Sequence, residues 1–170
     1  FRQNVLSELE PLLRSWAQEL RTPWSSLTLH ALRSTPGVTE GEVESTLLQK
    51  LQASYDDDIR LGSTTTGPHR DDFELRVDDR PLNVLASRGQ QRTVFLALVF
   101  AATKLIEDVL QDRPIILLDD VFSELDSEHQ EFLLHALKDH HVIITSTSAP
   151  VSLGSRARCW DVAGGTVILR

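Results

Sequence analysis

The stretch that decides the fold is IILLDD, residues 115–120, in which four aliphatic residues are followed at once by two aspartates. A continuous apolar run without alternation is typical of a strand that is buried on both faces of a parallel sheet. Because ligands bind at the carboxyl ends of such strands, Asp119 and Asp120 are candidate functional residues. Asp119 could hold Mg²⁺ through water, and Asp120 could activate an attacking water as a general base. The alternative is structural: Asp120 caps the following turn, and Asp119 is solvated.

A second motif, SRGQQ at residues 87–91, opens a long helix that is apolar nearly all round. The free N–H groups and the partial positive charge of a helix N-terminus attract anions, and Gly89 lets a phosphate approach the backbone closely. Ser87 adds a hydroxyl donor, and Arg88 adds a positive charge. The competing interpretation is an ordinary capping box, in which Ser87 and Gln90 satisfy each other's backbone N–H groups.

Two further motifs carry polar side chains. The first, Ser123–Asp126 (SELD), directly follows the acid pair, and its simplest interpretation is the N-cap of the next helix. The second, Gly67–Asp72 (GPHRDD), combines a turn with a histidine, an arginine and two acids. Since no second cluster of ligands supports a metal there, a structural turn held by an Arg–Asp pair is the favoured interpretation.

The rest of the sequence predicts alternating helices and strands. Apolar residues at helical spacing predict helices over 1–21, from Thr39–Glu42 to about Tyr55, over 87–110 and over 126–138. The second helix should stop before Asp56–Asp58, because anions are unfavourable at a helix C-terminus. Strands are expected at 26–32, 73–77, 81–85 and 142–145, with a terminal hairpin over 157–169. This order is typical of a layered α/β domain over 59–170, preceded by a helical piece over 1–58.

The composition excludes several classes of protein. Of the 170 residues, 41% are hydrophobic and 25% are charged, which is typical of a globular domain. The single cysteine, Cys159, excludes an intramolecular disulfide and favours a reducing compartment. No apolar run is long enough to cross a membrane, and no signal peptide is visible. The net charge of −8 makes the chain a poor overall electrostatic match for DNA.

One expected piece of a nucleotide site is missing from the sequence. None of the eight glycines is followed by lysine, so the phosphate-binding loop of P-loop enzymes is not in this chain. The sequence also contains no methionine, so Phe1 is not a translation start. We therefore expect the phosphate-binding loop to lie upstream of this chain.

Taken in order, the motifs resemble the RecF family of ABC-type ATPases, which is related to the SMC proteins. The resemblance covers about residues 59–147 and rests on four runs: GPHRDDF (67–73), ASRGQQRT (86–93), IILLDDVFSELD (115–126) and HVIITST (141–147). It implies the C-terminal half of an ABC-type P-loop ATPase domain, a layered α/β sheet with helices, over residues 59–170. Residues 1–58 would then be part of a helical, arm-like second lobe.

The resemblance also implies a role for each matching residue. The ABC signature, which contacts the γ-phosphate of ATP held by the opposite subunit, corresponds to Ser87, Arg88, Gly89 and Gln90. Asp119 corresponds to the Walker B carboxylate for Mg²⁺, and Asp120 to the catalytic base. Ser123 and Asp126 correspond to the D-loop at the dimer interface. At the switch position, which usually holds a histidine, Thr145 and Thr147 offer hydroxyls that can bond a phosphate but cannot carry a proton as histidine does, which suits a slow ATPase.

For function, the resemblance implies a cytoplasmic protein that forms an ATP- and Mg²⁺-dependent homodimer on duplex DNA near single-strand gaps. Such a protein acts with RecR and RecO to help load RecA in DNA repair, recombination and replication. Without the upstream phosphate-binding loop, this chain should not hydrolyse ATP alone. Two other interpretations stay open: a nucleotide-binding subunit of another ABC system such as a transporter, and a non-catalytic interaction module that keeps the ABC shape.

Overall fold

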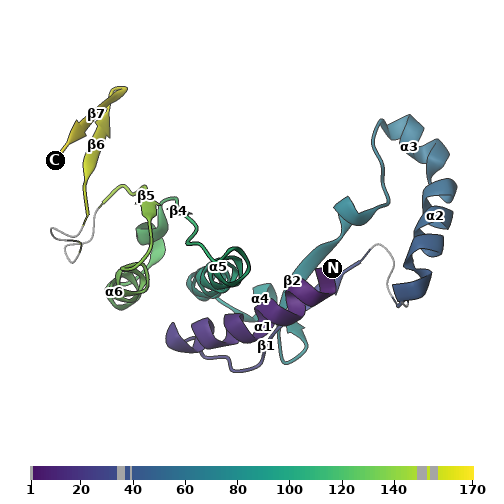
Figure 1. Cartoon of the computed structure of the whole chain (residues 1–170), viewed down its shortest axis with the longest axis horizontal. Coiled ribbons are helices and arrows are strands. Elements are labelled where there is room, and N and C mark those ends of the chain that lie inside the picture. Colours follow the sequence, from purple (N-terminus) through teal and green to yellow (C-terminus); the bar gives the residue numbers. More distant parts are fainter. Residues whose placement is uncertain (1, 34–36, 39, 149–152, 154–156) are drawn as a thin grey trace. The chain divides into compact units, whose positions relative to one another are not determined.

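The computed structural model describes residues 2–33, 37–38, 40–148, 153 and 157–170. The chain divides into two compact units, residues 1–101 and 102–170. The longest helix, α5 (Arg88–Leu110), contributes residues to both (Figure 1). This division does not test the functional boundary at residue 58, which stays a prediction.

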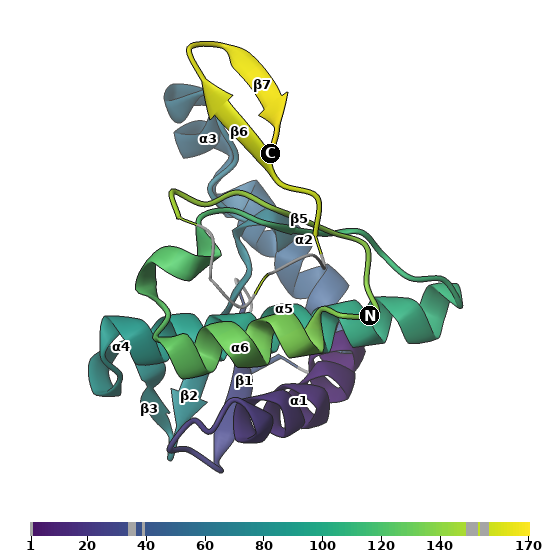
Figure 2. The same cartoon turned by 90° about the vertical axis from the view of Figure 1, so that its left-hand side faces the viewer.

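The first unit is built from a helix beside a small antiparallel sheet. Helix α1 (Arg2–Glu19) lies along β1 (Leu27–Leu32), which pairs with β2 (Asp72–Val77), and β2 pairs with the two-residue β3 (Arg80–Pro81) (Figure 2). Strands from either side of residue 58 therefore meet, with Leu27 opposite Val77. Buried apolar side chains along this seam are Leu9, Leu13 and Ala17 of α1, Leu20 directly after it, Leu27 and Leu29 of β1, and Val77 of β2.

The α1 helix also protects the free edge of the sheet. Arg14 donates from Nε to the carbonyl oxygen of Leu27 at 2.6 Å, and the backbone N–H of Leu29 donates to Glu10 Oε2 at 2.9 Å. Arg14 and Glu10 are themselves an ion pair at 2.5 Å. Since β1 is an edge strand whose outward N–H and C=O groups invite further pairing, these contacts limit its exposure.

The segment between β1 and β2 differs from the sequence prediction in one respect. After η1 (Glu40–Glu42), helix α2 (Val43–Ala53) ends before the three aspartates, as expected, but a second helix, α3 (Tyr55–Leu61), begins at once. The three acids, Asp56–Asp58, thus occupy the first turn of α3, where negative charge is favourable. Thr39, the first residue of the expected capping motif, lies outside the described residues.

The strand expected over residues 81–85 was largely wrong. The hairpin after β2 keeps only β3, and the chain then forms a single helical turn, α4 (Leu82–Leu85), before α5. A short 3-10 turn, η2 (Pro68–Arg70), precedes β2. Leu82 is buried in α4, whereas Val84 is exposed, so the apolar residues of this segment do not follow the two-residue period of a strand.

The second unit contains a pair of parallel strands. Strand β4 (Ile116–Leu118) pairs with β5 (Val142–Ile144). The chain between them forms the short η3 (Val121–Glu124) and helix α6 (Ser127–Ala136). A hairpin of β6 (Trp160–Ala163) and β7 (Thr166–Leu169) ends the chain, as expected.

The expectation that β4 is buried on both faces was wrong for the described structure. Ile116 and Leu118 are buried, but Leu117 is 70% exposed. Its partner in the register, Ile143, is 60% exposed. Because successive side chains of a strand point to opposite faces, the described residues cover one face of this two-stranded sheet and leave the other uncovered.

Candidate nucleotide site

The carboxyl ends of β4 and β5 bring two sequence motifs together. The strands are parallel and in register, with Ile116 opposite Val142 and Leu118 opposite Ile144. The residues that follow the strands, Asp119 and Asp120 on one side and Thr145 on the other, therefore meet at the same edge of the sheet. This is the edge at which α/β proteins bind ligands.

Backbone hydrogen bonds continue the pairing beyond the strands. The N–H of Thr145 donates to the carbonyl oxygen of Leu118 at 2.9 Å, and the N–H of Asp120 donates to the carbonyl oxygen of Thr145 at 3.0 Å. The Thr145 hydroxyl donates to Asp119 Oδ1 and accepts a second contact from the Asp120 N–H at 3.2 Å. Thr145 thus contacts both acids of the motif.

Asp120 has an unusual backbone conformation, with φ +46° and ψ +37° in the left-handed region. Aspartate tolerates this region better than most residues do. The conformation is held from both sides, because the Asp120 carbonyl oxygen accepts from the Ser123 hydroxyl at 3.0 Å while its N–H binds Thr145. The turn at Asp120 redirects the chain from β4 into η3, and Ser123 supports that turn.

Asp126 caps the helix that follows. Its side chain accepts from the backbone N–H of His129 at 2.9 Å, as the N-cap interpretation of the SELD motif predicts. This hydrogen bond holds the pKa of Asp126 below its ordinary value, and a contact with the His129 ring at 2.8 Å acts in the same direction. The capping role is confirmed, and the D-loop role stays a prediction.

The donor set at this sheet edge fits a magnesium ion. Asp119 is exposed, and a carboxylate oxygen is the kind of hard ligand that Mg²⁺ prefers. One or two carboxylates with several waters are the usual protein share of a Mg²⁺ site beside phosphates. Among the described residues, no group of three or more His, Cys, Asp or Glu forms a dedicated metal site. The residues therefore suit an ion that arrives with a nucleotide.

The signature residues form the capping box that the sequence allowed. The Ser87 N–H donates to Gln90 Oε1 at 2.9 Å, and the Gln90 N–H donates to Ser87 Oγ at 3.3 Å. In this arrangement the Ser87 hydroxyl acts as an acceptor, so its own proton stays available to an anion. The capping box and a phosphate contact are therefore compatible, and both interpretations of the motif can hold together.

Gly89 lies in the first turn of α5 with open space beside it. A Cβ atom at this position would meet no described atom within 4 Å beyond its chain neighbours and its own helix, and its φ is not positive. Neither backbone conformation nor packing in the described chain therefore requires glycine here. Gly89 therefore leaves room beside the first turn of α5, where the resemblance places a phosphate contact.

The predicted site residues thus fall into two clusters. Ser87, Arg88, Gly89 and Gln90 belong to the first unit, and Asp119, Asp120, Ser123, Asp126, Thr145 and Thr147 belong to the second. Thr147 is exposed two residues beyond Thr145, inside a turn in which the Ser146 hydroxyl donates to the Ser148 carbonyl oxygen at 2.6 Å. The sequence analysis did not predict the contacts of Thr145 with both acids. The available signal was that the acid pair and Thr145 each directly follow one of two strands expected to be parallel.

The GPHRDD segment is hydrogen-bonded to the loop that directly precedes it. Arg70 donates from Nε and Nη2 to the carbonyl oxygen of Thr64 at 3.0 and 2.8 Å. Asp58 Oδ1 accepts from the N–H and hydroxyl of Thr65 at 2.8 and 2.7 Å, which holds the pKa of Asp58 below its ordinary value. These bonds agree with the structural-turn interpretation, except that the hydrogen bonds of the arginine go to a carbonyl oxygen, while its charge acts on Asp58.

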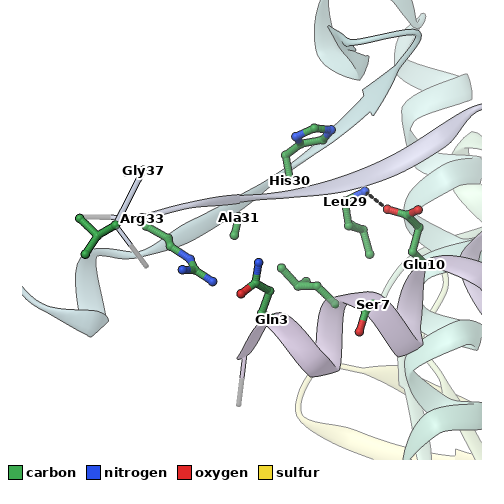
Figure 3. A pocket seen from close by; sticks show the side chains of 10 residues that line it. Gln3, Ser7, Glu10, Leu29, His30, Ala31, Arg33 and Gly37 are labelled. Atoms are coloured by element: carbon green, nitrogen blue, oxygen red, sulfur yellow. Dashed lines mark hydrogen bonds between the residues drawn. The ribbon is translucent and has the colours of Figure 1, made fainter. Parts of the chain in front are cut away.

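A hollow of about 630 Å³ lies between α1 and β1, away from the predicted residues of the first unit (Figure 3). Gln3, Ser7 and Glu10 of α1 line it from one side, and Arg33 lines it from the other. Glu10 is already engaged by the Leu29 N–H. The hollow contains none of the residues that the motifs single out.

Comparison with known proteins connects these residues to a family. The DNA replication and repair protein RecF of Cyanothece sp. is 34% identical to the sequence over 98% of this chain and 46% of its own length. The RecF protein of Gloeothece citriformis is 38% identical over 86% of this chain and 39% of its own length. This chain is homologous to RecF proteins. No family model matches the sequence.

Solved structures agree with the sequence comparison. The recombination mediator protein RecF of the RecFOR pathway, solved with ATP, superposes with a TM-score of 0.74 at 28% identity. A second RecF structure, with ATPrS, gives 0.72 at 27%. Each comparison covers 99% of this chain and 45% of the solved chain. The mixed α/β structure therefore matches part of RecF, and the chain spans somewhat less than half the length of these relatives.

Proposed function

We propose that this chain is the C-terminal part of a RecF-type ATPase that closes as an ATP-dependent dimer. The observation that carries the proposal is the meeting of Asp119, Asp120 and Thr145 at the carboxyl edge of two parallel strands. A phosphate-accessible helix start at Gly89 supports it. Homology to RecF proteins, two of them solved with ATP or ATPrS, supports the nucleotide.

In this proposal each cluster contributes to a different side of the nucleotide. Mg²⁺, when bound with ATP, neutralises phosphate charge. Asp119 would hold that ion through water, and Asp120 would accept a proton from the attacking water. The Ser87 hydroxyl, the Arg88 guanidinium and the N–H groups beside Gly89 would bind the γ-phosphate of ATP that is held by a second copy. Ser123 and Asp126 would line the same interface, and the Thr147 hydroxyl would bond a phosphate.

We call the ATP-dependent dimer a clamp, and its closure follows from mass action. ATP that is bound between two copies binds the closed dimer more tightly than the separate chains, so it shifts the equilibrium toward the dimer. Loss of the γ-phosphate removes the contacts with the signature helix and lets the dimer open. We place this cycle on duplex DNA near gaps in the cytoplasm, with RecR and RecO as partners and RecA loading as the outcome. Among the described residues no helix combines the length and the apolar character needed to cross a bilayer.

Light scattering of the full-length RecF protein that contains this sequence, with and without Mg-ATP, tests the proposal. We expect a shift from monomer to dimer with ATP and a return after hydrolysis. Substitution Ser87→Arg should abolish the shift and leave the fold intact, because the exposed Ser87 position accepts a larger side chain that would crowd the phosphate. A Ser87→Arg protein that dimerises normally with ATP would remove Ser87 from the site.

A further inference from the structure

The Thr145 hydroxyl already makes two contacts at the acid pair. A hydroxyl has one proton to donate and two lone pairs to accept with. Its proton is donated to Asp119 Oδ1, and one lone pair accepts from the Asp120 N–H at 3.2 Å. Thr145 could donate to a phosphate only by releasing Asp119. What stays free is an acceptor lone pair, which repels phosphate oxygens.

We infer that Thr145 is a positioning residue for the magnesium carboxylate rather than a phosphate ligand, an inference that rests on the proposed function. The hydroxyl fixes one oxygen of Asp119 and so orients the other toward the ion. This differs from the direct phosphate contact that the switch position suggested from sequence. It also separates Thr145 from Thr147, whose neighbours Ser146 and Ser148 bond each other rather than the acid pair.

The backbone supports such a role. The Thr145 N–H binds the Leu118 carbonyl oxygen, and the Thr145 carbonyl oxygen accepts from Asp120, so the residue is fixed on both sides of Asp119. A β-branched side chain also has few χ1 rotamers, which limits where the hydroxyl can point. The distance from Thr145 to the carboxylate is therefore set by the sheet pairing. Partners of this kind that orient a metal ligand are typically worth about 10- to 100-fold in metal affinity.

The experiment measures the Mg²⁺ requirement of the full-length protein. Binding of a fluorescent ATP analogue and ATP-driven dimerisation are titrated with Mg²⁺, and Mn²⁺ bound with ATP is counted by electron paramagnetic resonance. We expect Thr145→Val to raise the Mg²⁺ and Mn²⁺ concentrations for half-saturation by about 10- to 100-fold. Thr145→Ser, which keeps the hydroxyl, should stay near the parent protein. The matched control is Thr166→Val, which removes an exposed hydroxyl from the terminal hairpin.

Asp119→Ala separates this inference from the proposed function. If Asp119→Ala raises the Mg²⁺ concentration for half-saturation and Thr145→Val leaves it unchanged, the positioning role is wrong and the proposed site stands. If Thr145→Val weakens nucleotide binding equally with and without Mg²⁺, the hydroxyl is a phosphate ligand and the inference is overturned. If neither variant changes the metal requirement, the proposed function fails and the inference fails with it. If thermal melting shows that Thr145→Val is unfolded at the assay temperature, Thr145→Ala replaces it under the same criteria.

Discussion

Substitution Gly89→Ala should keep or raise the stability of the protein but weaken its ATP-driven dimerisation. In the structure a methyl group at Gly89 would meet no described atom within 4 Å outside its own helix and chain neighbours, and the backbone is not in the left-handed region. Alanine should therefore leave the free energy of unfolding unchanged or raise it by up to about 1 kcal/mol. The same methyl group would occupy the space through which a phosphate reaches the N–H groups of the first turn of α5.

The functional loss should be much larger than the stability gain. A displacement of about 1 Å between reacting or binding groups can lower the rate of the step they support by on the order of 100-fold. We expect the ATP-driven dimer of the full-length protein to need at least about 10-fold more protein or to disappear in light scattering. Urea unfolding of the same sample should give an equal or higher midpoint.

A second glycine provides the matched control. A Cβ atom added at Gly41 in η1 would also meet no described atom within 4 Å, and Gly41 has no positive φ, but it lies outside the signature. Gly41→Ala should leave dimerisation unchanged. Normal ATP-driven dimerisation of Gly89→Ala would refute the argument that this glycine exists to admit a phosphate, whatever the stability data show.

Two other predictions follow from named contacts. Asp120→Asn should slow ATP turnover of the full-length protein by about 100-fold or more while prolonging the ATP-bound dimer, because the base is lost and asparagine tolerates φ +46°; unchanged turnover would exclude Asp120 as the base. For Asp58, whose pKa is lowered first by the Thr65 hydroxyl, the loop stabilisation is present above the ordinary aspartate pKa and is lost as the pH falls through the lowered value. The protection factor of the Thr65 amide in hydrogen exchange should therefore fall in acid, and an Asp58→Asn protein that keeps the same acid dependence would contradict this.

The sequence predicted local structure well where one interaction decides it. The N-cap at Asp126 and the capping box at Ser87 and Gln90 depend on residues at most three positions apart, and both were confirmed. The strands predicted in IILL and over residues 142–145 were also confirmed, at 116–118 and 142–144. Such features need no knowledge of the rest of the fold.

One failed prediction came from local charge, and the others depend on which surfaces meet. Helix α3 was missed because three consecutive aspartates were interpreted only as a poor C-terminus for α2, although the same charges favour the start of another helix. The face of β4 at Leu117 is exposed because what covers a strand is decided by other parts of the molecule. The Thr145 bridge required the register of β4 and β5, since a shift of the pairing would move its hydroxyl away from Asp119.

Each cluster of the proposed site is ordered by its own hydrogen bonds before any nucleotide binds. Ser87 and Gln90 satisfy each other, and Thr145 holds Asp119 and Asp120 in place. A ligand that meets preorganised groups loses little free energy in ordering them. In the proposed dimer, the free energy of the ATP contacts with the two clusters would therefore mainly favour the association of two copies. This is the property that a nucleotide-controlled clamp requires, because its switch depends on the difference in nucleotide affinity between open and closed states.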